Sequence, residues 1–283
     1  MKSRFVYLIA FTALTLASLC AGPVPITPAQ LGYNPSVTFG PSGQPEYLIC
    51  PADVSGGCGG AFTENIGGIN ATIWCVDSQL DVHFGDTYPA YIEDLNGTPA
   101  PFDTNHVHYM NVTTYTGGVG GWANSWSYSL GGLGLATPDS AQTRYELAAI
   151  LISQYIPNSA MPDGGTSCNT ATCTENKSIQ DAIWHLTENN VAPNLGGAIN
   201  VGAPAGYTDW IAYAAHVLST EPASFFNQWA VVSGGWNVTT GTFSGTQYQT
   251  FLVQVTPEPR FYGLLLVGLL GLCGVIYRRR LAA

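Results

Sequence analysis

Two kinds of hydrophobic spacing alternate along the middle of the chain. Alternation of apolar and polar residues, typical of strands, occurs at 71–77, 229–232, 236–243 and 248–255. Helical spacing of apolar residues occurs at 144–156, 178–190 and 208–220. Strands followed by helices and then by strands predict an α+β fold, a β-sandwich or barrel with an inserted helical subdomain.

The residues that flank the helical patterns predict where the helices begin and end. Pro157 should end the first helix because proline has no N–H group to donate. Ser178 and Thr208 are favourable N-caps for the second and third helices. With Ser178 as the N-cap, Gln180 would lie in the first turn, where backbone N–H groups have no partner inside the helix.

The strand expected at 71–77 places its side chains on two faces. Thr72, Trp74 and Val76 should share one face, and Ile73 and Cys75 the other. Cys75 would then sit at a rigid position on a regular strand.

Both ends of the chain carry long apolar segments. Lys2 and Arg4 precede an apolar run at 5–19 and a group of small residues, so we expect residues 1–22 to be a secretory signal. Near the other end, the uncharged segment 261–277 is just long enough for a transmembrane helix. We therefore expect an exported protein that this helix first anchors in the membrane, with its basic tail in the cytoplasm.

The region 256–283 has three parts in a fixed order. A Pro-Glu-Pro motif precedes the apolar segment, and three arginines follow it: Pro257, Glu258, Pro259, Arg278, Arg279 and Arg280. This order resembles the PEP-CTERM sorting signal of Gram-negative bacteria. The resemblance implies recognition by an exosortase in the membrane and transfer to the cell surface or extracellular matrix. The alternative is a plain single-pass anchor.

Between the two ends, we divide the chain into a proline-rich extended lead-in at 23–59 and a folded domain at 60–255. Of the chain's 18 acidic residues, all but Glu258 lie between residues 23 and 256, together with only two basic residues, Arg144 and Lys177. Nucleic acids and anionic membrane surfaces are therefore not expected as partners.

The chain has seven cysteines, and one of them is left over after pairing. Cys20 belongs to the signal and Cys273 to the apolar C-terminal segment. In an oxidising compartment we expect the local disulfides Cys50–Cys58 and Cys168–Cys173. Cys75 then has no nearby cysteine with which to pair, which makes it a candidate for special chemistry.

Two short motifs include Cys75 and Gln180. The first is Ile73-Trp74-Cys75-Val76-Asp77. The second is Ile179-Gln180-Asp181-Ala182-Ile183-Trp184. Together they resemble the cysteine and glutamine motifs of bacterial thioester domains, which include surface adhesins. The resemblance implies an internal Cys75–Gln180 thioester that covalently captures an amine-bearing partner, in an environment formed by Trp74, Asp77, Ile183 and Trp184.

The residues themselves are suited to this chemistry, which needs no cofactor or metal. A thiolate is a strong nucleophile, and the Gln180 carboxamide can accept it with loss of ammonia. The helix N-terminus expected before Gln180 would stabilise the developing oxyanion. Trp184, one turn further on the same face, would exclude water.

Two other functions remain open. One is a non-covalent structural or matrix protein sorted by exosortase. The other is a cysteine hydrolase that uses Cys75 with His83, His106 or His185 as the base, although no motif supports that spacing. His106 and His108 have no clear third ligand, so no metal site is expected. We favour a single-turnover covalent binding module, which is not an enzyme.

Overall fold

The computed structural model describes ten segments of the chain: 25–40, 47–49, 59–77, 82–96, 101–107, 130–135, 140–155, 170–187, 198–243 and 248–256. They contain nine strands: β1 (Gly32–Phe39), β2 (Tyr47–Ile49), β3 (Gly59–Ile66), β4 (Ile69–Cys75), β5 (Thr87–Asp94), β6 (Trp229–Gly234), β7 (Trp236–Asn237), β8 (Thr242–Phe243) and β9 (Thr250–Gln254). They also contain three α-helices: α2 (Ala141–Ile152), α3 (Ala171–Thr187) and α4 (Trp210–Leu218).

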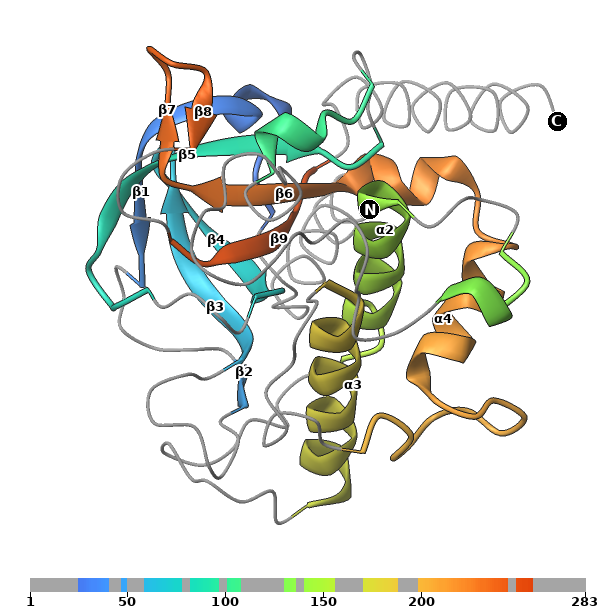
Figure 1. Cartoon of the computed structure of the whole chain (residues 1–283). Coiled ribbons are helices and arrows are strands. Elements are labelled where there is room, and N and C mark those ends of the chain that lie inside the picture. Colours follow the sequence, from blue (N-terminus) through green and yellow to red (C-terminus); the bar gives the residue numbers. More distant parts are fainter. Residues whose placement is uncertain are drawn as a thin grey trace, which may run out of the picture.

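Six antiparallel strands close into a barrel (Figure 1). They pair in the order β1-β5-β6-β9-β4-β3, and β3 pairs again with β1 to complete the ring. β2 pairs with the other half of β3, and β7 and β8 form a separate small hairpin. The prediction of an α+β fold is therefore confirmed, with a barrel as its sheet.

Local sequence explains two details of the barrel. The β3–β4 hairpin turns through Gly67 and Gly68, which have φ values of 58° and 89°, a conformation that favours glycine in a two-residue turn. In β1 the register with β5 shifts between Asn34 and Val37. Pro35 lies in this irregular stretch, where a missing N–H costs no regular ladder hydrogen bond.

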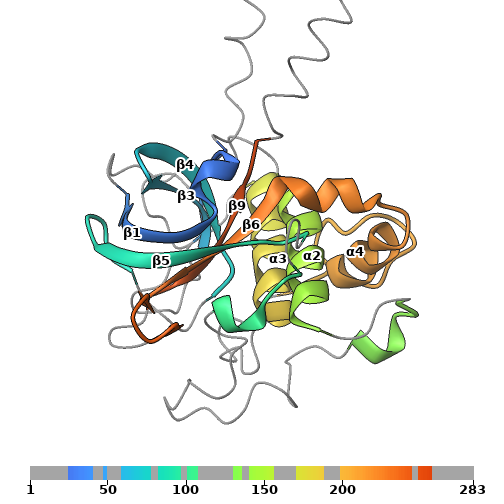
Figure 2. The same ribbon diagram turned by 90° about the horizontal axis from the view of Figure 1, so that it is seen from above.

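The three α-helices lie between β5 and β6 in the sequence and on one side of the barrel in space (Figure 2). Ser140 caps α2, because its side chain accepts a hydrogen bond from the Thr143 N–H. Asp209 caps α4 in the same way, one residue after the predicted cap, Thr208. The predicted strand and helix order is thus correct over this part of the chain.

Two apolar clusters hold these layers together. One fills the barrel interior, with side chains from all six barrel strands, and it includes Ile73 and Cys75. The other is the barrel–helix interface, in which Trp74 and Val76 pack with the helices. β4 therefore alternates between the two clusters, as the sequence predicted. The buried Arg144 of α2 donates to the Leu186 backbone oxygen at 2.8 Å and so links α2 to α3.

The predicted lead-in at 23–59 needs a correction. Its residues 32–39 are extended, but they form β1, which closes the barrel, so the domain begins before residue 60. The expected signal at 1–22, the Pro-Glu-Pro motif and the transmembrane segment 261–277 lie outside the described residues. Among the residues that the structure describes, no helix is both long and apolar enough to cross a membrane.

Candidate functional site

The fold brings the two predicted reactive residues together. Cys75 ends β4, and Gln180 lies on α3, 105 residues further along the chain. The Gln180 Nε2 donates a hydrogen bond to the Cys75 backbone oxygen at 3.0 Å. Both side chains are fully buried. Their contact lies where the helix packs against the end of the strand.

Two hydrogen-bond donors converge on the carboxamide oxygen of Gln180. The Gly60 backbone N–H donates to Oε1 at 2.9 Å, and the Tyr155 hydroxyl donates at 2.7 Å. Burial raises the pKa of Tyr155 well above its usual value, so the hydroxyl keeps its proton at neutral pH. Attack on this carboxamide would place negative charge on Oε1. The two donors therefore have the geometry of an oxyanion hole.

The thiol of Cys75 is also held from two sides. Its Sγ donates to the Asp77 backbone oxygen at 3.1 Å, and the Gln249 Nε2 donates to Sγ at 2.8 Å. Gln249 also donates to the Asp77 backbone oxygen, and Asp77 Oδ2 accepts from the Thr250 N–H. This network fixes the sulfur in one position. It also places an N–H donor where charge would build up when the thiol loses its proton.

The other residues of the two motifs divide between the clusters. Trp184 belongs to the barrel interior with Cys75 and is buried, so it adds apolar cover on that side of the site. Ile183 packs in the barrel–helix interface and anchors α3. Trp74 lies on the opposite face of β4 from Cys75, where its ring packs 5.5 Å from that of Trp229. Trp74 therefore supports the strand from its other face.

The expected helix start at Ser178 is wrong. α3 begins at Ala171, so Gln180 lies well inside the helix, where no backbone N–H is left over for an oxyanion. Ser178 is buried, and its hydroxyl donates to the Ala198 oxygen and accepts from the Val201 N–H. The donors that the sequence assigned to the helix N-terminus are instead supplied by Gly60 and Tyr155.

The histidines considered as bases for Cys75 have other surroundings. His83 is largely exposed and pairs with Asp86 at 3.5 Å, and His106 lies 2.8 Å from Glu93. His185 lies on α3, where burial lowers its pKa. Within the described segments, no three His, Cys, Asp or Glu side chains gather in a way that could hold a metal ion.

The structure describes two of the cysteines, Cys75 and Cys173. Cys75 is a buried thiol, and Cys173 on α3 is in a disulfide. The partner of Cys173 lies outside the described residues, as do Cys50, Cys58 and Cys168. The two predicted disulfides therefore remain predictions, while Cys75 keeps its thiol.

Sequence reasoning missed three residues of the site: Gly60, Tyr155 and Gln249. Gly60 belongs to a glycine-rich stretch, and Tyr155 lies just before the proline that was expected to end a helix. Gln249 lies within a predicted strand pattern. None of them belongs to a motif, so no local signal identified them.

No family model, no curated protein and no solved structure matches this chain. The chemistry of the site therefore has to be inferred from its geometry. That geometry comprises a buried thiol and a buried carboxamide in neighbouring positions, with two donors on the carboxamide oxygen and one on the sulfur.

Proposed function

We propose that Cys75 and Gln180 form an internal thioester, and that the protein uses it to bind an amine-bearing partner covalently. The observation that carries this proposal is the pair of donors on Gln180 Oε1, from Gly60 and Tyr155. A glutamine that only supports the fold needs hydrogen-bond partners for its polar atoms and no nucleophile nearby. The second requirement of the chemistry, a nucleophile, is met by the buried thiol of Cys75, whose backbone oxygen accepts from this same carboxamide. The resemblance of both motifs to thioester domains supports the same conclusion.

The forming step balances without a cofactor. The Cys75 sulfur attacks the Gln180 carbonyl carbon, and the thiol proton passes to the departing nitrogen. The C–N bond breaks, ammonia leaves, and a C–S bond replaces it. During the attack, negative charge on Oε1 is stabilised by the Gly60 N–H and the Tyr155 hydroxyl.

The capturing step uses a primary amine of the partner. The amine attacks the thioester carbonyl, the C–S bond breaks, and the sulfur of Cys75 takes up the proton that the amine releases. Gln180 is then joined to the partner through an amide bond. Each molecule reacts once, so the protein acts as a covalent binding module and not as an enzyme.

We place this module outside the cell. The signal expected at 1–22 would direct export, and the Pro-Glu-Pro motif with helix 261–277 and the arginines would present the chain to an exosortase. The barrel would then reach the cell surface or the extracellular matrix. An attached covalent binder suits adhesion, because an amide bond does not dissociate when the partner is pulled away.

The first prediction is the mass of the purified chain comprising residues 23–256. After disulfides are allowed for, its mass should be short by one ammonia, and methylamine should add one methylamine to Gln180. Intact mass spectrometry with peptide mapping checks both values. Cys75→Ala should restore the full mass and abolish the methylamine adduct.

A second variant provides an independent test in case Cys75→Ala does not fold. Gln180→Glu keeps the shape of the side chain but offers a carboxylate, which thiols do not displace under these conditions. It should likewise show no loss of ammonia and no adduct. Full mass and a reactive thiol at Cys75 in the unchanged chain would contradict the thioester and leave a non-covalent surface or matrix protein.

A further prediction concerns Lys177, which is the only lysine between residues 23 and 256. It lies three residues before Gln180, and its Nζ is 2.7 Å from Asp181 Oδ2. This ion pair fixes the Lys177 Nζ against Asp181. Asp181→Asn should release the amine, so that an intrachain Lys177–Gln180 amide forms and the fraction that reacts with methylamine falls severalfold.

Peptide mapping and thiol labelling of Cys75 check this prediction, because the intrachain amide and the thioester have the same mass. The matched control is the double variant Lys177→Arg with Asp181→Asn, since a guanidinium does not aminolyse the bond. Its methylamine reactivity should return to that of the unchanged chain. Equal loss of reactivity in the double variant would show that Asp181 acts on the site itself.

A further inference from the structure

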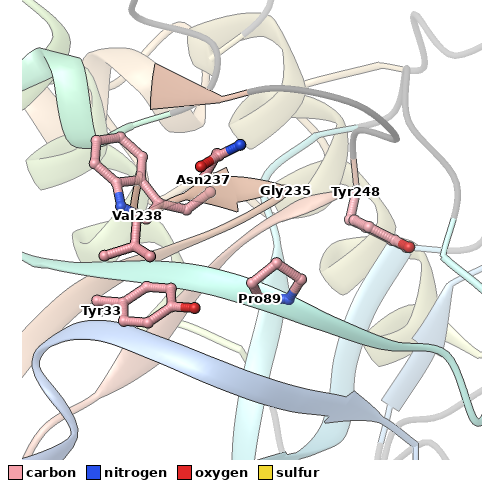
Figure 3. A pocket seen from close by; sticks show the side chains of 7 residues that line it. Tyr33, Pro89, Gly235, Asn237, Val238 and Tyr248 are labelled. Carbon is pink, nitrogen blue, oxygen red and sulfur yellow. The ribbon is translucent and has the colours of Figure 1, made fainter. Parts of the chain in front are cut away.

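A pocket of about 370 Å³ opens on the barrel, beside β1, β5 and β7 (Figure 3). β1 and β5 form its floor, and the β6–β7 turn and the residues just before β9 form its sides. Its lining includes Tyr33, Pro89, Trp236, Asn237 and Tyr248. No residue of the proposed thioester site belongs to it. A ligand bound in this pocket would therefore be independent of the proposed thioester.

The pocket is built on a rigid frame. Gly235, with a φ of 88°, lets the chain turn sharply from β6 into β7, and its N–H donates to the Pro89 oxygen at 2.8 Å. The Trp236 ring is fixed by Tyr91 at 5.0 Å and by Phe243 at 5.0 Å. These contacts hold the pocket in shape without a ligand.

The ring of Tyr248 is held in place by Tyr88. Its ring stacks on that of Tyr88, with the centroids 4.2 Å apart. A side chain on Gly234 would begin only 2.6 Å from the Cβ of Tyr248 and 2.8 Å from the Tyr88 ring. A glycine at this position is therefore what allows the stacked pair to lie against β6.

The pocket combines aromatic surface with a few uncharged polar groups. Tyr33 is 40% exposed and presents its ring to solvent at the rim. Tyr33 and Tyr248 also carry hydroxyls (Figure 3). The oxygen of the Asn237 amide accepts from the Thr239 and Thr240 N–H groups, which fixes the amide. Among the described residues none accepts from its NH₂ group, which can therefore donate to a ligand. Among the lining residues that the structure describes, none is charged.

We propose that this pocket binds a neutral saccharide unit. A sugar ring offers an apolar C–H face for the tyrosine ring and hydroxyls for the Asn237 amide and the tyrosine hydroxyls. A charged ligand would lose its hydration here without meeting an opposite charge. A purely apolar ligand would leave the polar groups of the lining without partners.

The structure favours a saccharide over an extended peptide. β1, which forms part of the floor, pairs with β5 on one side and β3 on the other, so it offers no open edge to which a peptide strand could be added. Proline-rich peptides lie across several exposed aromatic rings. Here Trp236 is nearly fully buried, and Tyr33 is the main exposed ring.

The test uses the full chain in a detergent without sugar groups. The probes are tetrasaccharides of glucose, galactose, mannose and N-acetylglucosamine, titrated with calorimetry and ligand-observed NMR. At least one should bind with a Kd below about 1 mM, the weak end of specific binding. Tyr33→Ala and Asn237→Asp should each weaken that binding at least about tenfold, the effect of losing about 1.4 kcal/mol. Asn237→Asp keeps the oxygen that accepts from Thr239 and replaces the NH₂ donor.

The matched control is Phe84→Ala. Phe84 is 53% exposed, and it packs on Phe39 outside the pocket. This variant should bind as the unchanged chain does. Binding that is equal in Tyr33→Ala and Asn237→Asp, or no binding by any of the four probes, would overturn the proposal. Binding of a proline decamer that depends on Tyr33, without saccharide binding, would also overturn it and would assign the pocket to peptides.

Discussion

Tyr155→Phe is expected to slow both formation of the thioester and its reaction with methylamine by roughly 100-fold, the typical effect of removing one donor from an oxyanion hole. The variant removes the hydroxyl that lies 2.7 Å from Gln180 Oε1 and keeps the ring. The Gly60 N–H remains as the second donor, so residual reactivity should persist. The rate of methylamine uptake, followed by intact mass, measures the effect.

The pH dependence separates this role of Tyr155 from that of a base. Burial raises the pKa of Tyr155, so the hydroxyl stays protonated and can donate throughout the neutral range. The ratio of the two rates, unchanged chain over Tyr155→Phe, should therefore stay constant between pH 6 and pH 9, which lies below the usual tyrosine pKa of about 10. A ratio that rises with pH would indicate a tyrosinate base instead.

Tyr213→Phe is the control for loss of a tyrosine hydroxyl. Tyr213 lies on α4, where its ring contacts Tyr207 and Trp210 away from Gln180. This variant should react at the rate of the unchanged chain. If Tyr155→Phe also reacts at that rate, the Tyr155 hydroxyl has only a structural role, and the Gly60 N–H alone must stabilise the oxyanion.

The sequence predicted the reactive pair better than its surroundings, for a physical reason. Cys75 and Gln180 lie in short motifs, and each motif is confined to one strand or one helix. The groups that polarise them come from elsewhere. Gly60 is 120 residues from Gln180, and Gln249 is 174 residues from Cys75. Only closure of the barrel and packing of α2 and α3 bring these groups together, and no local pattern encodes that.

The start of α3 shows how tertiary contacts override local preference. Residues 171–177 include two threonines, a cysteine and an asparagine, which favour helices weakly, and Ser178 is a good N-cap. The helix nevertheless begins at Ala171. Ser178 finds its partners in Ala198 and Val201, which lie 20 and 23 residues after it in the chain. A serine whose hydroxyl is satisfied by another segment has no need to cap its own helix.

For a related reason, the sequence does not reveal that the proline-rich segment before residue 60 contains the barrel strand β1. Prolines disfavour strands because they remove a ladder hydrogen bond. Pro35 is accepted in β1 because the register with β5 is already broken there. The sequence shows the proline but not the irregularity that accommodates it, since that depends on how β5 and β3 meet β1 on either side.

The second large effect is expected on stability, and it depends on Glu64 of β3 in the barrel interior. The carboxyl group is fully buried, and Tyr88 donates a hydrogen bond to its Oε1. Loss of hydration raises its pKa from the usual 4.5 to about 8, and the Tyr88 hydrogen bond opposes only part of that rise. Glu64 is therefore neutral at pH 7, and neutrality is what allows it to lie in an apolar cluster.

This raised pKa makes the stability of the barrel depend on pH. Between pH 4.5 and about 8 the folded chain holds a proton on Glu64 that the unfolded chain has lost, so the free energy of unfolding falls as pH rises. The contribution is fully present below pH 4.5 and lost above about pH 8. At about 1.4 kcal/mol per pKa unit, the loss amounts to at most about 5 kcal/mol.

Glu64→Gln should remove most of this dependence, because an amide keeps the acceptor for Tyr88 and never ionises. Urea unfolding at pH 5, 7 and 9 should show a variant close to the unchanged chain at pH 5 and several kcal/mol more stable at pH 9. A shallow slope should remain, since burial also raises the pKa of Glu146 to about 7 and of Asp181 to about 6. Glu221→Gln, at a partly exposed position, should leave the full slope in place. Equal stability of the unchanged chain at pH 5 and pH 9 would mean that Glu64 ionises without cost, which requires water or a cation to reach it inside the barrel.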